Sequence, residues 1–493
     1  MKKFIVFLLL LFCPLAFAEI SITPFGAAGI VSGSSFLIES GPKSALIDCG
    51  LFYENDGDNF SINPKAVKAG ALILTHSHLD HIGKVPLLIY QGFKGTIYST
   101  PATKEFVLEF FSNGSGFDLI KRKWAWSKNV KAGDKKAIVH WIDSCIENIK
   151  KVQWSQKEAV ISEVRREYGI NFSFCKICLN LDTQKIANMF KTSKYNEKVK
   201  LFDNFDFYFF DAAHIPGSAS LFFNIDGKKI VFSGDLGSGY SRLTGQSQNA
   251  PKADFVFMEG TNSANIEDDA AYDSFHSDLK RALAQDKSVW ITALAFNRTQ
   301  KVLYELKLMQ DDGEISKNIE IYSISPYANK INRLYDEEVK NKANDWFVED
   351  IYKNRTVLPK NLKFTAPKDF SKQFILLSAS GNEKTAANLI KRFQKRGSVL
   401  IMSTNYLSED NILLKIPYSN SQADKIETKK YGVFSDHPNV FELLRWLSNQ
   451  DKNAQIYLVH YDVKNIRRFL RFFADKNINL KETKILEKVV IKQ

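Results

Sequence analysis

Four residues whose side chains bind metal ions fall within six positions of one short segment. The segment spans residues 75–81, has the sequence THSHLDH, and contains His76, His78, Asp80 and His81. It follows the apolar run 71–74, which predicts a buried strand that ends just before a polar loop. Imidazole and carboxylate groups are typical protein ligands of zinc. Because the chain has only eight histidines, an ordinary core or a solvated loop explains this grouping poorly, and we predict a metal site.

Three more ligand-type residues lie in comparable positions along the chain. Asp48, His214 and Asp235 each come at or just past the end of a predicted strand. Taken alone, each would be interpreted as an ordinary loop residue. The ends of neighbouring strands meet at one edge of a sheet, so we expect these three side chains to converge with the histidine-rich segment.

The secondary-structure pattern changes along the chain. Short β-rich runs occupy residues 20–50 and return between 205 and 257, whereas helix and strand alternate from about residue 273 onward. Such alternation predicts a parallel sheet with helices on both faces. With 44% hydrophobic and 25% charged residues, disordered and fibrous chains are excluded. The sequence therefore predicts an α/β protein with more than one domain.

These motifs resemble the metallo-β-lactamase fold, whose HxHxDH motif is present in full. The resemblance is narrower to the RNA-processing β-CASP branch of that family, and five segments carry it: MEGT at 258–261, AFNRTQ at 295–300, SASG at 378–381, FSDH at 434–437 and LVH at 458–460. The resemblance implies an αββα sandwich with an inserted parallel α/β domain. The implied domains are 19–260 (with a basic helical insertion at about 105–180), the inserted β-CASP domain at 261–405, and a second part of the sandwich at 406–493.

The resemblance also implies a dinuclear zinc centre with two Zn²⁺ ions per chain. One ion is held by His76, His78 and His214, and the other by Asp80, His81 and His460. Asp235 bridges them, and their shared hydroxide attacks phosphorus.

Further roles follow from the same resemblance. His437 is the expected general acid, Glu259 orients it, and Asp48 fixes the tautomer of a ligating histidine. The expected phosphate-binding groups are Arg298, Ser380 and Gly381.

The chain departs from the family pattern at several motif positions. Asn297 replaces the usual glycine, Asp436 replaces the small residue before the motif histidine, and Tyr461 replaces the glycine after His460. The serine-glycine turn is followed by Asn382 instead of methionine. These changes leave the metal ligands intact and alter the wall that faces the substrate, so the sequence supports hydrolysis more firmly than any one substrate.

The leading functional hypothesis is a zinc-dependent RNA endonuclease or 5′-exonuclease, with single-stranded RNA or another nucleic acid as partner. The formal charge of +12 favours an anionic partner without identifying it. One alternative is a hydrolase of another exported substrate, either a different phosphodiester or a β-lactam-like amide. About 145 residues between 261 and 405 argue against a plain lactamase. A binding protein without catalysis would have lost ligands, and none is missing.

The N-terminal segment has the features of a signal peptide. Lys2 and Lys3 precede an apolar stretch that ends at Ala16-Phe17-Ala18. We therefore expect residues 1–18 to be removed and the protein to be exported to a bacterial periplasm or secreted; a buried N-terminal helix is the alternative. Past the first twenty positions no apolar run reaches the length of a spanning helix. We thus expect no membrane insertion after cleavage, and a homodimer is left open.

Two weaker signals lie in the insertion. Residues 121–136 carry seven basic side chains and two tryptophans against one aspartate. Such a pattern is typical of single-strand binding, and a solvated insertion with buried tryptophans explains it at least as well. Cys175 and Cys178 have CxxC spacing without a second pair, so a disulfide, with Cys145 as a further partner, is favoured over a metal knuckle.

Overall fold

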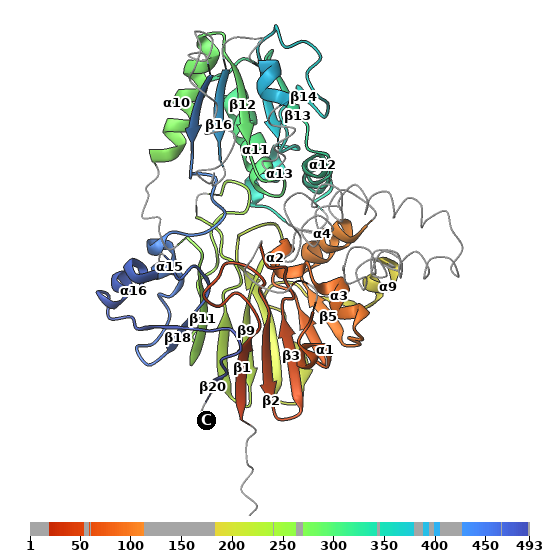
Figure 1. Ribbon diagram of the computed structural model, residues 1–493, viewed down its shortest axis with the longest axis vertical. Helices are drawn as coiled ribbons and strands as arrows, with labels where there is room; N and C mark the ends of the chain where they lie inside the picture. The colour runs from red at the N-terminus through yellow and green to blue at the C-terminus, as the bar shows by residue number, and fades with distance from the viewer. Residues whose placement is uncertain are drawn as a thin grey trace, which may run out of the picture.

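The structure is a computed structural model, shown in Figure 1. It describes residues 19–53, 59, 61–112, 183–239, 241–262, 270–342, 346–378, 388–393, 399–404, 426–464 and 466–491. Several predictions fall outside these residues: the leader at 1–18, most of the insertion with its basic segment at 121–136, the cysteines at 145, 175 and 178, and the phosphate-binding candidates Ser380 and Gly381.

Two seven-stranded sheets form the lower part of the molecule in Figure 1. In hydrogen-bonded order the first contains β20 (Val489–Ile491), β1 (Ile20–Pro24), β2 (Phe36–Ser40), β3 (Lys43–Ile47), β4 (Ala71–Ile73), β5 (Thr96–Ser99) and β6 (Phe190–Thr192). The second contains β19 (Leu480–Glu482), β18 (Gln455–Tyr461), β11 (Phe255–Gly260), β10 (Lys228–Phe232), β9 (Ala219–Ile225), β8 (Phe205–Asp211) and β7 (Val199–Phe202). Each sheet contains a run of parallel strands, namely β3 to β6 in the first and β10, β11, β18 and β19 in the second, whereas β8 is antiparallel to both of its neighbours.

The two sheets share an apolar core that excludes water between them. Alternate residues of strands in both sheets, such as Ile38, Ile73, Phe207 and Phe223, are buried in that core. Helices cover the outer face of the first sheet: α1 (Pro64–Val67), α2 (Leu79–Ile82), α3 (Val85–Tyr90), α4 (Pro101–Phe111) and α9 (Thr183–Asn188). The outer face of the second sheet is covered by α15 (Val440–Trp446) and α16 (Ile466–Ala474). This is the predicted αββα sandwich.

A third sheet forms the upper part of the molecule, and we call this unit the cap (residues 270–430). Its strands are all parallel, in the order β14 (Leu362–Lys363), β13 (Glu320–Ser323), β15 (Phe374–Ser378), β12 (Ser288–Thr292), β16 (Val399–Ser403) and β17 (Ile426–Lys430). Its helices are α10 (Ala270–Ala284), α11 (Arg298–Asp311), α12 (Pro326–Asn341) and α13 (Glu349–Lys353). The predicted fold class, a sandwich with an inserted parallel α/β domain, is confirmed.

One predicted boundary needs correction. The sequence ended the inserted domain at residue 405, yet β17 pairs in parallel with β16 and so belongs to the cap sheet. The charged sequence IETKK of β17 does not have the apolar pattern of a buried strand, which explains the error. The predicted boundary at residue 260 stays a prediction.

The cap contacts the sandwich through an aromatic cluster beside α4. Phe106 and Phe110 of α4 lie with their ring centroids 4.9 and 5.8 Å from that of Phe296, and Phe110 lies 4.8 Å from Tyr327 of α12. All four rings are buried. Because aromatic rings bury large apolar areas, this contact holds the cap over one side of the sandwich. Among the described residues, no helix is long and apolar enough to cross a membrane.

Candidate metal centre and active site

The predicted ligands come together where the parallel strands end. The segment 75–81 follows β4, and Asp235 follows β10. His460 is the second-to-last residue of β18. His214 follows β8. The sequence predicted this convergence. Parallel neighbours place their carboxyl ends at a common edge, and β8 ends at the same edge as β10 because both are antiparallel to β9.

One group of possible ligands consists of three histidines. The side-chain nitrogens of His76, His78 and His214 all lie within 4.8 Å of one another. His78 Nδ1 is 3.2 Å from His76 Nε2 and 3.1 Å from His214 Nε2. Three imidazole nitrogens that face one point at this spacing form a typical zinc ligand set.

A second group combines carboxylates with imidazoles. Asp80, His81, Asp235 and His460 are all buried, and one ligand atom of each lies within 4.8 Å of the others. Asp235 Oδ1 is 3.3 Å from His81 Nε2, and Asp235 Oδ2 is 3.7 Å from His76 Nε2. Asp235 therefore faces both groups, the position that a bridging carboxylate needs.

Three buried atoms that lack a well-formed hydrogen bond indicate that these residues fit a metal. His81 Nε2, Asp235 Oδ1 and His460 Nε2 are buried and make no hydrogen bond of good geometry within the described part of the chain. Buried polar atoms without partners cost free energy, and binding to a cation would satisfy all three. The donor set of nitrogen and carboxylate oxygen suits zinc. The residues present thus fit the group that the sequence motifs imply.

The protonation of the histidines is set by burial and by carboxylates. Burial lowers the pKa of His76 and of His214 well below the usual histidine value, so both rings are neutral and offer a lone pair. Burial acts in the same direction on His81, but the carboxylates of Asp235 and Asp48 outweigh it and raise the pKa of His81. Loading a metal would therefore displace a proton from His81.

Asp48 lies behind the ligands and fixes their orientation. Its Oδ2 is 2.7 Å from His81 Nδ1 and accepts a hydrogen bond from Thr75 Oγ1 at 2.8 Å, while its Oδ1 accepts from Thr75 N at 2.8 Å. Since His81 Nδ1 is engaged by Asp48, its Nε2 is turned toward Asp235. The structure places Asp48 where the predicted positioning role requires it.

Backbone strain concentrates around the same residues. Asp48, Ala213 and His460 adopt left-handed conformations, with φ of 57°, 53° and 51°. Such conformations cost about 1–3 kcal/mol each in residues other than glycine. Gly50 has a different requirement, because a Cβ there would lie 1.6 Å from Asp80 O. Strained backbone and close packing thus occur at the residues that position the ligand side chains.

His437 and Glu259 lie together at the rim of the cluster. His437 Nδ1 is 3.1 Å from Glu259 Oε2, and the ring centroid of His437 is 4.7 Å from that of His214. Burial would lower the pKa of His437, but the charge and hydrogen bond of Glu259 raise it to about 9. His437 is therefore protonated at neutral pH, as a general acid must be. One ring nitrogen of His437 also lies within 4.8 Å of ligand atoms of His214 and Asp235, so His437 is close enough to bind a metal instead.

The cap reaches the site through a buried polar junction. Asp436 Oδ1 accepts hydrogen bonds from Lys301 Nζ at 2.6 Å and from Asn297 Nδ2 at 2.7 Å. Asn297 Nδ2 also lies 2.9 Å from His214 O, and the Asp436 carbonyl accepts from His214 Nδ1 at 2.8 Å. Burial opposes ionisation of Asp436, but Lys301 and Arg298 hold the pKa of its carboxyl well below its usual range. We call Asn297, Lys301 and Asp436 the junction.

Arg298 differs from the sequence-based expectation. It lies beside the His437 motif, but its Nη1 donates to Thr404 O at 2.8 Å and its Nε is 3.8 Å from Asp436 Oδ2. Only 13% of its side chain is exposed. These contacts argue against Arg298 as a freely available phosphate ligand, and its phosphate-binding role stays a prediction.

Sequence reasoning gave no role to two residues that the structure places at the site. Thr261 Oγ1 lies 2.7 Å from His460 Nδ1 and thereby orients that ring. Lys301 pairs with Asp436 inside the junction. Thr261 carried no distinguishing signal, whereas the departures at Asn297 and Asp436 from the family pattern were the available indication that something pairs there.

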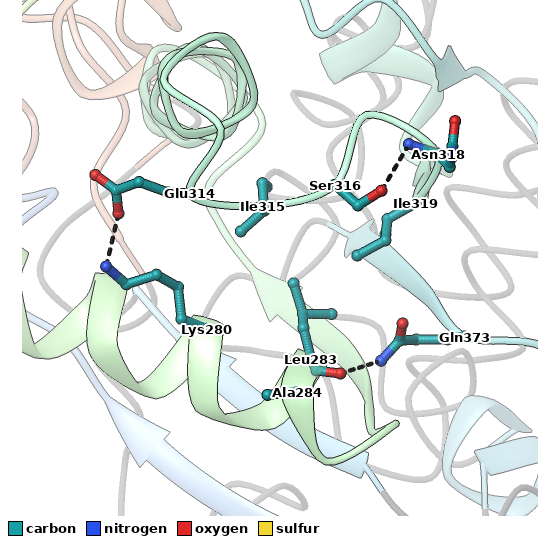
Figure 2. Close-up of a pocket in the computed structure, with 9 residues that line it drawn as sticks. All are labelled: Lys280, Leu283, Ala284, Glu314, Ile315, Ser316, Asn318, Ile319 and Gln373. Atoms are coloured by element: carbon teal, nitrogen blue, oxygen red, sulfur yellow. Dashed lines mark hydrogen bonds and ion pairs between the residues drawn. The ribbon is translucent and has the colours of Figure 1, made fainter.

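A separate hollow lies in the cap, with a cavity volume of about 530 Å³. Figure 2 shows its lining between α10 and the loop before β13, with the Lys280–Glu314 ion pair at 2.9 Å and Gln373 donating to Leu283 O at 2.7 Å. Neither a histidine nor any residue of the two ligand groups lines it. The ligand groups, and not this hollow, are therefore the candidate active site.

Comparisons with known proteins agree with this geometry. The sequence profile of the metallo-beta-lactamase superfamily matches residues 28–143, which include the HxHxDH segment. Residues 28–143 therefore match that superfamily, and the sandwich with an inserted parallel α/β cap has the arrangement expected of its β-CASP branch.

Several curated proteins are similar to this chain, and two of the following three are named as ribonucleases. The chain is 25% identical over 89% of its length to Ribonuclease TTHA0252 of Thermus thermophilus, of which the match covers 92%. It is 25% identical over 62% of its length to an RNase J-like protein of Methanocaldococcus jannaschii, of which 61% is covered. It is 23% identical over 66% of its length to Cleavage and polyadenylation specificity factor 73 of Drosophila melanogaster, of which 41% is covered.

One solved structure has a similar arrangement of helices and strands. A protein of unknown function from Enterococcus faecalis matches 96% of this chain and all of its own, with a TM-score of 0.53 and 10% identity. At this identity the likeness concerns the arrangement of elements alone.

Proposed function

We propose that this protein is a zinc-dependent nuclease that hydrolyses phosphodiester bonds in RNA. The observation that carries the proposal is the position of His437, a protonated imidazole oriented by Glu259 at the rim of two adjacent ligand groups. Hydrolysis of a phosphodiester needs an activated water on one side of phosphorus and a proton for the leaving oxygen on the other. The two ligand groups support activation of the water, and His437 beside Glu259 supports donation of the proton.

The chain's own residues would divide the work as follows. His76, His78 and His214 would hold one zinc ion, and Asp80, His81 and His460 the other, with Asp235 between them. When bound, the two ions would lower the pKa of a water and stabilise negative charge on phosphate oxygens.

Asp48 and Glu259 would orient histidine side chains, and His437 would donate the proton that the leaving oxygen needs. Asp48 holds His81 in the tautomer that presents Nε2. Glu259, which also accepts from Leu236 N at 2.6 Å, keeps His437 charged and aimed at the site. His437 would give its proton to the leaving sugar oxygen, so that the products are a hydroxyl and a phosphate monoester.

RNA is the substrate class that the relatives support. The match to Ribonuclease TTHA0252 spans both the sandwich and the cap, at 89% of this chain. The cap also argues against a β-lactam-like amide, because a small substrate does not require a second α/β domain over the site. A hydrolase of another phosphodiester is the second candidate.

The test uses the full chain loaded with zinc. We expect cleavage of end-labelled single-stranded RNA, no turnover of a chromogenic β-lactam, and loss of RNA cleavage in Asp235→Ala. A ladder of products would indicate an endonuclease, and mononucleotides from one end an exonuclease. Turnover of the lactam without RNA cleavage would contradict the proposal, and cleavage of DNA alone would favour the second candidate.

We further propose that residues 1–18 direct export, which the lysines and the apolar stretch of the leader support. The N-terminal sequence of the protein recovered from fractionated bacterial cells is the test. A mature chain that begins at Glu19 outside the cytoplasm is expected, and an intact Met1 in the cytoplasm would contradict export.

A further inference from the structure

An exposed aromatic side chain lies close to the catalytic motif on the sandwich. Phe441 in the first turn of α15 is 56% exposed, and it is four residues from His437. Four residues of chain span at most about 14 Å, so Phe441 lies within that distance of the proposed acid. Its ring meets Phe472 of α16 edge-on, with centroids 5.5 Å apart. A large apolar ring held in solvent by a neighbouring ring is available for stacking.

The outward face of α16 surrounds this ring pair with positive charge. Arg467, Arg468 and Arg471 are exposed, while Ile466, Phe469 and Phe473 of the same helix are buried against the second sheet. Arg468 is one helical turn from both Arg471 and Phe472, so these residues share a face. Within the described residues, none of the three arginines forms an ion pair.

Acidic groups do not offset this charge. Glu442 of α15 accepts from Asn439 N at 2.8 Å and also contacts Gly239 N, so its carboxylate is turned to backbone amides. Asp462 accepts from Lys464 N at 2.9 Å before α16 begins. Asp475 lies one turn past Arg471 at the end of this face, and it pairs with none of the three arginines within the described residues, so three arginines face one carboxylate. The face between these ends is basic.

We propose that Phe441, Phe472, Arg467, Arg468 and Arg471 form a surface that binds single-stranded RNA outside the metal centre. Bases would stack on Phe441, and the guanidinium groups would contact the phosphates, the combination that holds single strands without sequence preference. Figure 1 shows α15 and α16 on the flank of the sandwich, below the cap. This surface, which rests on the proposed nuclease function, would hold the part of a long RNA that extends beyond the cleaved bond. We call it the flanking surface.

The test measures RNA binding and cleavage separately. Binding is measured in full-length protein that also carries Asp80→Asn, so that no variant cleaves the probe. Replacing Arg467, Arg468 and Arg471 with Glu should weaken binding of a labelled single-stranded RNA and reduce the salt slope by about 2, at about 0.7 for each lost phosphate contact. Phe441→Ala should weaken binding about 5- to 150-fold, the range expected for one lost stack.

Matched controls separate this surface from net charge and from exposed aromatics. Replacing Lys317, Lys360 and Lys372, three exposed lysines of the cap, with Glu changes the charge equally, and Tyr90→Ala removes another exposed ring, one that is 43% exposed. Both controls should leave RNA binding within about threefold. Hydrolysis of a small activated phosphodiester should be unchanged in every surface variant without Asp80→Asn, which also shows that each variant folds. Gln replaces Glu at the three arginines if the reversed charges prevent folding.

The outcomes distinguish this proposal from the proposed function. RNA cleavage and binding that are equal in the surface and control variants would overturn the flanking surface and leave the nuclease intact. RNA binding that depends on the surface in a protein that cleaves no RNA would overturn the nuclease but not the surface. Surface variants that lose binding to anionic lipid vesicles, with RNA binding unchanged, would assign the face to membranes and overturn the proposal.

Discussion

The two ligand groups and the junction both bury a carboxylate beside positively charged or polar nitrogen groups, yet the hydrogen bonding of their buried atoms differs. In the ligand groups, His81 Nε2, Asp235 Oδ1 and His460 Nε2 have no hydrogen bond of good geometry within the described residues. In the junction, Asp436 and Lys301 neutralise each other at 2.6 Å. Buried polar atoms that the fold leaves open indicate a ligand, whereas charges that the fold pairs indicate structural support. Both regions adjoin His214, so the difference can be tested by substitution.

The largest expected effect follows from removing the shared carboxylate. Asp235→Ala should abolish RNA cleavage, by at least about 10⁴-fold, which exceeds the contribution of a general acid, and should lower the zinc content. Asp206→Ala, an aspartate on β8 that pairs with Lys198 at the surface, is the matched control and should keep both. Elemental analysis and single-turnover kinetics are the measurements. Full zinc content with a rate within tenfold of wild type would mean that Asp235 is not a ligand.

The next effect separates chemistry from metal binding. His437→Ala should retain zinc and lose about 10²–10⁴-fold in kcat, the range for removal of a general acid. Zinc content is measured beside kcat. A loss of zinc in this variant would place His437 among the ligands, as its distance to His214 and Asp235 permits.

The pH profile examines the same pair with a milder change. Because Glu259 raises the pKa of His437 to about 9, the rate should fall as pH rises through that value and the acid loses its proton. Glu259→Gln removes the charge, so the alkaline limb should move toward the ordinary pKa of about 6.5. The stabilising effect of the pair is present below that ordinary value and is lost as pH rises to about 9. An unmoved alkaline limb would show that another group sets it.

The junction should respond in stability more than in chemistry. Asp436→Ala leaves Lys301 buried without its partner, and we expect about 3–5 kcal/mol of destabilisation. Asp436→Ala combined with Lys301→Met should recover part of that loss, because the Lys301 charge is removed while the largely buried Arg298 still lacks its carboxylate neighbour. Denaturant unfolding of the single and double variants gives the coupling energy. If the losses in unfolding free energy of the two single variants simply add in the double variant, Lys301 and Asp436 do not stabilise each other. The junction would then not differ from the ligand groups in the way stated above.

The smallest effect is expected at Arg298. Its contacts with Thr404 O and Asp436 leave little of the guanidinium for a phosphate. Arg298→Lys should therefore change RNA affinity by less than about threefold and leave the salt slope unchanged. Titration of labelled RNA at several salt concentrations measures both. A slope lower by about 0.7, the value for one phosphate contact to a single strand, would restore the role that the sequence suggested.

Much of the fold could be predicted from local patterns. The apolar run before His76 and the alternating residues of β8 are found as strands, since burial imposes its period directly on the sequence. The strand–helix alternation after residue 273 predicted the parallel cap sheet. The charged β17 was missed, because its place in the sheet depends on pairing with β16 and not on its own pattern.

The sequence by itself determined which residues could meet at the metal centre. The ligands are imidazoles and carboxylates at or near strand ends, and the resemblance of their motifs to a known family grouped them, His460 included. Tertiary structure alone decided what surrounds the ligands. Examples are the contact of Thr261 Oγ1 with His460 Nδ1, the left-handed backbone at Asp48 and His460, and the pairing of Lys301 with Asp436. These contacts join residues far apart in the chain; Lys301 and Asp436, for example, are separated by 135 positions. Whether a buried charge is paired depends on what packs against it in space, and no local pattern records that.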